Sequence, residues 1–265
     1  GRSIRNLIQI AQDDRVRAVL NIEKEHFQSE AFLDTHFVLM VTKRGQVKKT
    51  PLEAFSRPRV DGIIAIDTVD GDELLEARLT DGDTEIVLGA TNGRAIRFHE
   101  SDVRPMGRNT RGVRGMSLED DEAIVGMIAV KREGASVLTV AENGYGKRSP
   151  LEDYRRQSRG GKGILTMKTT AKTGPLVALK SVVDGDDLMI VTEHGITIRM
   201  RVSDIREMGR NTQGVRVINL KSADAIADVT RLILDEEEQA AAEADGGAEA
   251  APAADGPPPT PAEAA

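Results

Sequence analysis

The clearest chemical pattern in the sequence is a set of lysines and arginines that follow glycine turns. Four segments each contain an apolar stretch, a turn glycine and then basic residues, with the turns at Gly45, Gly93, Gly144 and Gly195. Ammonium and guanidinium groups bind phosphate oxygens through charge-assisted hydrogen bonds. The side chains that we expect to contact a polyanion are Lys48, Lys49, Arg97, Lys147, Arg148, Arg199 and Arg201, with Arg44 and Arg94 next.

A second glycine motif follows each hairpin. Residues 107–114 and 209–216 are nearly identical and lie 102 residues apart, and residues 157–163 occupy the corresponding place between them. The motif cations could either contact phosphate or bridge repeats; they are Arg108, Arg159, Lys162 and Arg210. The glycines at 160, 161 and 163 favour tight loop geometry. This segment lacks the glycine-to-lysine spacing of a nucleotide phosphate loop, so nucleotide binding there is rejected.

Residues for covalent or metal chemistry are missing from the pattern. The chain has no cysteine, which excludes disulfides, thiolate metal sites and a cysteine nucleophile. Its four histidines are scattered without metal-ligand spacing. Acidic turns such as 70–73 lack the ligand spacing of a calcium loop. We therefore expect no catalytic residue, no metal site and no cofactor in this chain.

The period of the pattern predicts the fold. The turn glycines are 48, 51 and 51 residues apart, and each unit contains short runs rich in valine and isoleucine. Four short strands in about fifty residues are typical of a propeller blade. The sequence predicts type I′ hairpins at Asn92-Gly93 and Asn143-Gly144. A helical period is discernible only near residues 223–239.

The charge alternates with this period. Windows 43–59, 94–114, 147–172 and 199–216 carry +5, +4, +6 and +3, whereas the three gaps between them are acidic. Units stacked in a ring would therefore form a continuous positive rim, which is typical of a surface that binds a duplex backbone. Two tyrosines, five phenylalanines and no tryptophan leave few platforms for stacking unpaired bases. We expect contacts with phosphate and DNA shape rather than base reading, although these residues would also suit RNA.

Composition divides the chain into two parts. Residues 235–265 contain nine acids, no base and few large apolar residues, which predicts a disordered tail. This acidic tail could compete with DNA for the rim. Residues 1–234 are expected to fold as one array, with blades starting near 37, 86, 136 and 187. Residues 1–36 are expected to form the second half of a preceding blade. No apolar run is long enough to span a membrane.

Several motifs together resemble the C-terminal domain of the bacterial DNA gyrase A protein. They are Thr42-Lys-Arg-Gly-Gln-Val-Lys-Lys-Thr50, Val69-Asp-Gly-Asp-Glu-Leu74, Glu142-Asn-Gly-Tyr-Gly-Lys-Arg148 and the two stretches 103–115 and 202–215. The resemblance covers about residues 1–234. It implies an all-β β-pinwheel, a propeller-like disc of four-stranded blades that wraps duplex DNA around a basic perimeter. Here we expect four full blades plus the end of a preceding one.

The resemblance also implies partners and a cellular place. The expected partners are duplex DNA, the gyrase B protein and the N-terminal part of gyrase A, in a holoenzyme with two copies of each protein. ATP and Mg²⁺ are expected only in other parts of that holoenzyme, as is the catalytic tyrosine. The expected location is the bacterial cytoplasm, near the nucleoid, with no membrane partner. The whole holoenzyme would introduce negative supercoils.

The sequence departs from the family's pattern in two respects, and two alternative functions remain open. The family's wrapping motif belongs to the first blade, whereas Gln157-Ser-Arg-Gly-Gly-Lys-Gly163 lies in a later repeat and has Ser158 in place of an arginine. We interpret this segment as a loop that joins blades and makes some phosphate contact. One alternative is the equivalent domain of topoisomerase IV, which selects substrates. The more distant alternative is a propeller that binds acidic proteins.

Overall fold

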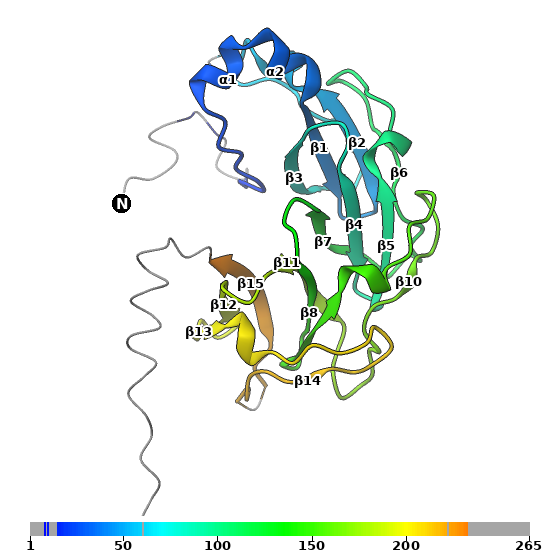
Figure 1. Ribbon diagram of the computed structural model, residues 1–265, viewed down its shortest axis with the longest axis vertical. Coiled ribbons are helices and arrows are strands. Elements are labelled where there is room, and N and C mark those ends of the chain that lie inside the picture. The colour runs from blue at the N-terminus through cyan, green and yellow to red at the C-terminus, as the bar shows by residue number, and fades with distance from the viewer. Residues whose placement is uncertain (1–7, 9, 11–14, 60, 222, 233–265) are drawn as a thin grey trace, which may run out of the picture. The chain divides into compact units, whose positions relative to one another are not determined.

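The protein is described here from a computed structural model that covers residues 8, 10, 15–59, 61–221 and 223–232 (Figure 1). The chain divides into two units, Gly1–Leu232 and Ile233–Ala265. The second unit, with the predicted disordered tail, lies outside the described residues, and everything below concerns the first unit. No helix among the described residues is long and apolar enough to cross a membrane.

Strands dominate the described part of the chain. Helices α1 (Lys24–Gln28) and α2 (Glu30–Thr35) precede them. The strands are β1 (Phe37–Thr42), β2 (Gln46–Pro51), β3 (Leu74–Thr80), β4 (Glu85–Ala90), β5 (Arg94–His99), β6 (Val113–Arg114), β7 (Ile124–Ala129), β8 (Ser136–Ala141), β9 (Tyr145–Pro150), β10 (Ile164–Leu165), β11 (Leu176–Val182), β12 (Asp187–Thr192), β13 (Thr197–Arg201), β14 (Val215–Arg216) and β15 (Ile226–Leu232). Short 3₁₀ helices follow four of them: η2 (Leu52–Phe55), η3 (Glu100–Asp102), η4 (Leu151–Asp153) and η5 (Val202–Asp204).

Adjacent repeats exchange strands. The sheet orders are β3-β1-β2-β6, β10-β5-β4-β7, β11-β8-β9-β14 and β13-β12-β15, and all the pairings are antiparallel. Strands β6, β10 and β14 each lie later in sequence than the hairpin that they join, because the chain reaches back to the previous sheet before it returns. The expected all-β blade architecture is confirmed, with three four-stranded sheets and a fourth sheet of three strands among the described residues.

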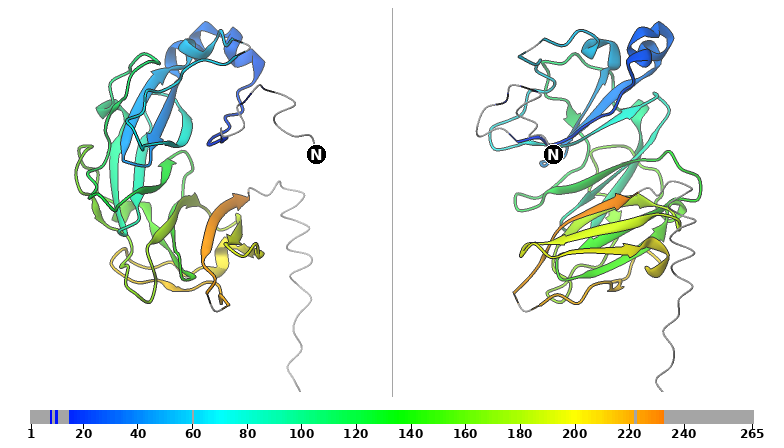
Figure 2. Two further views of the ribbon diagram at one scale, coloured as in Figure 1. Left: turned by 180° about the vertical axis from the view of Figure 1, so that it is seen from behind. Right: turned by 90° about the vertical axis from the view of Figure 1, so that its left-hand side faces the viewer.

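The four sheets succeed one another in chain order (Figure 1), and the two views of Figure 2 show the same succession. Strands β3, β7, β11 and β15 contact one another in series and form the inner side of the array. Apolar residues of neighbouring sheets share their cores. In one cluster, Leu39 of β1, Leu88 of β4 and Met127 of β7 are buried together.

The hairpin turns differ from the predicted type. Asn92 and Asn143 do not have the positive φ that a type I′ turn requires of both central residues, so that prediction is wrong. Instead, each turn has three residues and ends in a left-handed glycine, with φ of 76° at Gly93 and 82° at Gly144. The Gly93 N–H donates to the Ala90 carbonyl, as in a tight turn followed by a glycine bulge.

Two other local predictions need correction. The helical period near 223–239 is overruled within the described residues, because Ile226–Leu232 forms β15 and pairs with β12. Conversely, residues 24–35 form two short helices where the sequence predicted none. Their apolar residues, including Phe27 and Phe32, pack against Met40 of β1 and Leu52 of η2. Residues 15–22, expected to continue a preceding blade, contain no strand.

Candidate nucleic-acid interface

Three rows of arginines repeat at a spacing of 51 residues. The first row follows the hairpin turn and contains Arg97, Arg148 and Arg199. The second row, just after the 3₁₀ helix, contains Arg104, Arg155 and Arg206. The third row, in the second glycine motif, contains Arg108, Arg159 and Arg210. The contacts of each row show which cations are available to a ligand.

Two of the predicted phosphate-binding lysines are buried. The Nζ of Lys147 donates to the carbonyls of Gly209 at 2.7 Å and Arg210 at 2.5 Å. The Nζ of Lys48 donates likewise to the carbonyls of Arg108 and, at 2.8 Å, of Ala65. Both residues have a relative exposure of 0%. These ammonium groups join one repeat to the backbone of the next, so neither can be offered to a phosphate in this structure.

Burial also changes how these two lysines titrate. Burial, together with repulsion from the nearby Arg108 and Arg210, lowers the pKa of Lys48 and of Lys147 to about 8. A charged ammonium loses hydration when it is buried, and carbonyl oxygens compensate only part of that loss. Both lysines therefore have the environment of structural cations rather than of solvent-facing ligand contacts.

The next hairpin position also joins repeats. The Nζ of Lys49 donates to the Glu100 carbonyl at 2.9 Å, and Arg97 donates to the carbonyls of Leu151 and Tyr154. These carbonyls lie in or directly after the 3₁₀ helices η3 and η4 of the following repeats. Basic side chains satisfy the carbonyls that a helix end leaves unpaired.

The third copy of this joint is made by Arg148. Its Nε donates to the carbonyl of Ile205, the residue that caps η5, at 2.8 Å, and it pairs with Asp184. Lys49 is 4% exposed and Arg148 is 8% exposed. Carbonyls and carboxylates hold the charges of Lys48, Lys49, Lys147 and Arg148 in this structure, and phosphate contact by these four residues stays a prediction.

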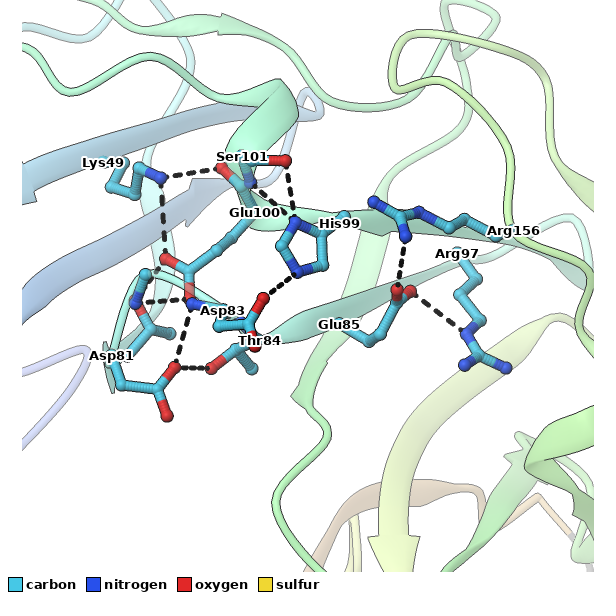
Figure 3. A network of polar contacts seen from close by, with 12 residues as sticks. Lys49, Asp81, Asp83, Thr84, Glu85, Arg97, His99, Glu100, Ser101 and Arg156 are labelled. Atoms are coloured by element: carbon cyan, nitrogen blue, oxygen red, sulfur yellow. Dashed lines mark hydrogen bonds and ion pairs between the residues drawn. The ribbon is translucent and has the colours of Figure 1, made fainter.

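A polar network surrounds the first two of these joints (Figure 3). The Glu100 carboxylate is fully buried, lies 3.7 Å from the Nζ of Lys49 and accepts hydrogen bonds from Thr80, Gly82 and Thr84. The Glu85 carboxylate pairs with Arg97 at 3.2 Å and with Arg156 at 3.4 Å. Arg97 is therefore neutralised as well as engaged with backbone carbonyls.

In the last sheet the hairpin cations are more exposed. Arg199 pairs with Asp187 at 2.6 Å, and 53% of its side chain is exposed. Arg201 is exposed at the end of β13. Near the turns of earlier hairpins, Arg44 and Arg94 are exposed too, and Arg94 donates to the Gly163 carbonyl at 3.2 Å. These four remain candidates for phosphate contact.

The third row of arginines connects the second glycine motifs of neighbouring repeats through hydrogen bonds. Arg108 donates to the Ile64 carbonyl, Arg159 to the Arg114 carbonyl and Arg210 to the Leu165 carbonyl. Each arginine contacts the repeat before its own. The three carbonyls that accept these hydrogen bonds lie at equivalent positions of their repeats. In this structure the row therefore joins blades, and phosphate contact, the other role left open by the sequence, stays a prediction.

Residues 157–163 form such a joining loop. The Gly160 N–H donates to the Gly115 carbonyl at 2.6 Å, and Arg159 also donates to the Asp102 carbonyl. A Cβ added to Gly163, whose φ is +71°, would lie 2.5 Å from the Ala95 carbonyl oxygen. Lys162 is exposed and pairs with Glu119 at 3.1 Å. The glycines therefore allow close backbone approach, and Lys162 is the cation of this loop that faces solvent.

The second row of arginines differs from the other two because its side chains are exposed and without partners among the described residues. Arg104, Arg155 and Arg206 are all exposed, and none of their side chains makes a hydrogen bond or ion pair with another described residue. Each follows a buried residue with extended backbone: Val103, Tyr154 or Ile205. Successive side chains of an extended chain point to opposite sides, so each buried anchor directs the next arginine outward.

Sequence reasoning missed this row. The signal was available, because an arginine recurs at 104, 155 and 206 at the same spacing as the other two rows. The hairpin cations were predicted instead, because they lie beside the turn glycines. Among the described residues, no group of histidine, aspartate and glutamate side chains could hold a metal ion.

The strand-exchanged sheets and the serial inner strands define a β-propeller-type repeat domain, in which exposed arginines recur at a spacing of 51 residues. A family model described as "DNA gyrase C-terminal domain, beta-propeller" matches residues 36–81, 84–131, 135–182 and 186–232. The chain therefore belongs to the DNA gyrase C-terminal domain family, which confirms the resemblance found in the sequence.

Relatives and solved structures agree with this family. The chain is 40% identical over 240 residues to the DNA gyrase A protein of Escherichia coli, an alignment that covers 90% of the chain and 26% of the relative. It is 36% identical over 268 residues to the gyrase A protein of Pseudomonas aeruginosa, covering 88% and 29%. The chain thus spans little more than a quarter of these relatives.

Two solved structures share the fold. A DNA gyrase A C-terminal domain matches with a TM-score of 0.75 and 27% identity, over 88% of this chain and 75% of that one. The C-terminal domain of a DNA topoisomerase IV matches with a TM-score of 0.81 and 25% identity, over 94% and 76%. The fold alone therefore does not separate the two kinds of topoisomerase.

Proposed function

We propose that this domain binds duplex DNA along its cationic periphery and bends it, as part of a type II topoisomerase of the gyrase kind. The observation that carries the proposal is the row Arg104, Arg155 and Arg206, whose guanidinium groups are exposed, unpaired among the described residues and repeated in the second, third and fourth blades. A row with the period of the fold follows the curvature of the array. A DNA backbone that follows the same curve would meet one of these cations in each of the last three repeats.

The binding would depend on charge rather than on sequence. Each arginine would contact a phosphate and release condensed counterions, which gives affinity without base reading. Bending 20–30 base pairs by 40–90° costs about 1–6 kcal/mol, so several repeats must act together to offset it. Arg44, Arg94, Lys162, Arg199 and Arg201 would add contacts from the turns and the joining loop.

The similarity to gyrase A proteins supports a role for this domain within a larger assembly. The domain would act with the rest of gyrase A and with the gyrase B protein in the bacterial cytoplasm. ATP hydrolysis, Mg²⁺ and strand cleavage would belong to those other segments. The wrapped DNA would be presented to them so that strand passage introduces negative supercoils.

The topoisomerase IV role remains a second candidate, because its C-terminal domain gives the higher TM-score of the two solved structures. The two roles differ in DNA geometry. Bound to a nicked circle that is then ligated, a wrapping domain shifts the linking-number distribution after the protein is removed. A domain that binds without such a shift would fit substrate selection better.

The decisive test of DNA binding replaces the exposed row. The triple variant Arg104→Ala, Arg155→Ala, Arg206→Ala should weaken binding to unrelated duplexes and lower the slope of log affinity against log salt by about 3. A matched control removes three exposed lysines outside the basic windows: Lys24→Ala, Lys131→Ala, Lys221→Ala. Fluorescence anisotropy over a salt series measures both. Equal slopes for the two triple variants would exclude the row from the interface.

A further inference from the structure

A cavity of about 570 Å³ lies against the inner strands of the array, and we call it the inner pocket. Its walls include residues of all four sheets, contributed by the strands β3, β7, β11 and β15, which Figure 1 shows on the inner side. Small-molecule sites have volumes of roughly 300–1,000 Å³. The inner pocket therefore has the size of a site for a small molecule.

The residues around the inner pocket are strongly basic. Among the described residues that line it, none is acidic and five are basic: Arg78, Lys131, Arg132, Lys180 and Arg231. Arg78 and Lys180 occupy equivalent places in their repeats, because they pair with Leu39 and Leu138 at the same register of their sheets. The repeats thus bring cations from separate sheets to one place.

Only two of these five cations have a carboxylate partner. The guanidinium of Arg132 donates to both carboxylate oxygens of Asp186, at 2.7 and 2.9 Å, and Arg78 pairs with Glu76. The other three have no carboxylate of a described residue within ion-pair distance; they are Lys131, Lys180 and Arg231. Three positive charges around the inner pocket therefore lack a paired carboxylate.

The cations of the inner pocket also repel one another. The Arg231 guanidinium is held by a hydrogen bond to the Ser181 carbonyl at 2.9 Å. Burial lowers the pKa of Arg231, attraction by Asp186 opposes this change, and repulsion from Arg132 and Arg78 adds to it. An anion between like charges that are fixed in this way would replace repulsion by attraction.

We propose that the inner pocket binds a compact polyphosphate anion, either an inorganic phosphate chain or the phosphates of a nucleotide. Guanidinium and ammonium groups bind phosphate oxygens through charge-assisted hydrogen bonds. A short phosphate chain carries several negative charges in a small volume, which suits three unpaired cations around one cavity. Arg132 and Arg231 are already held by Asp186 and Ser181, so little side-chain entropy is lost when the anion binds.

This site is separate from the proposed DNA contacts. In the first sheet the order is β3-β1-β2-β6, so the inner strand β3 is not adjacent to β2. Pro105, which directly follows the exposed Arg104, bridges to Lys49 of β2. Glu207, which follows Arg206, bridges in the same way to Arg148 of β9, while β11 is the inner strand of that sheet. The exposed arginine row and the inner pocket therefore lie toward different edges of the sheets.

Calorimetric titration with tripolyphosphate, and separately with ATP in the absence of Mg²⁺, tests the proposal at low salt. The unchanged chain should bind one anion. Lys180→Met should weaken binding of both anions by about 10- to 100-fold, the value of a hydrogen bond to a charged group. Lys180 has no partner among the described residues, so its replacement leaves no buried group unpaired. Lys180→Arg should retain binding.

Two controls separate the inner pocket from general attraction of anions. Lys221→Met removes the same charge at an exposed position outside the pocket and should bind like the unchanged chain. The triple variant Arg104→Ala, Arg155→Ala, Arg206→Ala should also keep its affinity for tripolyphosphate. This second control makes the proposal independent of the proposed DNA contacts.

Three results would overturn the proposal. The first is the absence of saturable binding of either anion to the unchanged chain with a Kd below about 1 mM. The second is equal affinity of Lys180→Met and Lys221→Met. The third is loss of binding in the triple variant alone, which would place the anion at the exposed arginine row.

Discussion

The ammonium group of Lys147 donates a hydrogen bond to the backbone carbonyl of Gly209, 62 residues away, at 2.7 Å. Lys48 makes the same joint with the carbonyl of Arg108 two repeats earlier. In both cases a buried charge holds the second glycine motif of another repeat. The joint explains why basic residues recur in register without all being available to a ligand.

Removing this joint should affect stability more than DNA binding. In Lys147→Met, two carbonyls lose their donor, which costs about 1–3 kcal/mol of unfolding free energy when such groups stay buried. Urea denaturation measures the loss, and the salt slope of DNA binding should stay unchanged. Lys168→Ala, an exposed lysine of the same repeat, is the control. A large fall in the salt slope with unchanged stability would place Lys147 in the interface instead.

The same lysines should give stability a specific pH dependence. The pKa of Lys147 is about 8 in the folded chain, below its ordinary value of 10.5. Between these two pH values the unfolded chain binds more protons than the folded chain, so the free energy of unfolding rises with pH. Below about pH 8 the folded chain carries the full cost of the buried charge.

Comparison with a variant isolates this effect from other titrations. The stability difference between the unchanged chain and Lys147→Met should move in favour of the unchanged chain from pH 7.5 to pH 10. Urea denaturation at both pH values checks the sign. A difference that is constant with pH would mean that Lys147 titrates normally.

Replacing a turn glycine by alanine should lower the free energy of unfolding by an amount that depends on the atoms next to the new Cβ. Alanine at Gly144 or Gly195 costs about 1–2 kcal/mol of unfolding free energy, because the backbone at both positions is left-handed. At Gly144 the new Cβ would also lie 2.6 Å from the Ile218 carbonyl oxygen, whereas Gly195 is open. Gly144→Ala should therefore lose about 1–3 kcal/mol more, as overpacked sites do. Equal losses in urea denaturation would contradict the strand exchange at this turn.

The sequence predicted what depends on local periodicity. Four units with a turn glycine each, the all-β blades and the alternating charge all follow from residue spacing. Strand exchange could not be predicted, because the donor of each sheet lies in the next repeat and two-residue strands such as Val113–Arg114 have no pattern of their own. The role of each cation was hidden for a related reason, since the carbonyls that hold Lys48 and Lys147 belong to distant backbone. The helical period near residues 223–239 did not determine the structure of residues 226–232, because these residues pair with β12.

Two arginines seven residues apart should separate joining from DNA binding. Arg148 is buried and donates to the Ile205 carbonyl, while Arg155 is exposed and unpaired among the described residues. Arg155→Ala should lower the salt slope by about 0.9 and leave stability unchanged, because it removes one phosphate contact. Arg148→Ala should cost about 1–3 kcal/mol through the orphaned carbonyl and leave the slope unchanged in the folded fraction. Anisotropy and urea denaturation on both variants test the contrast, and a reversed outcome would assign phosphate binding to the hairpin row.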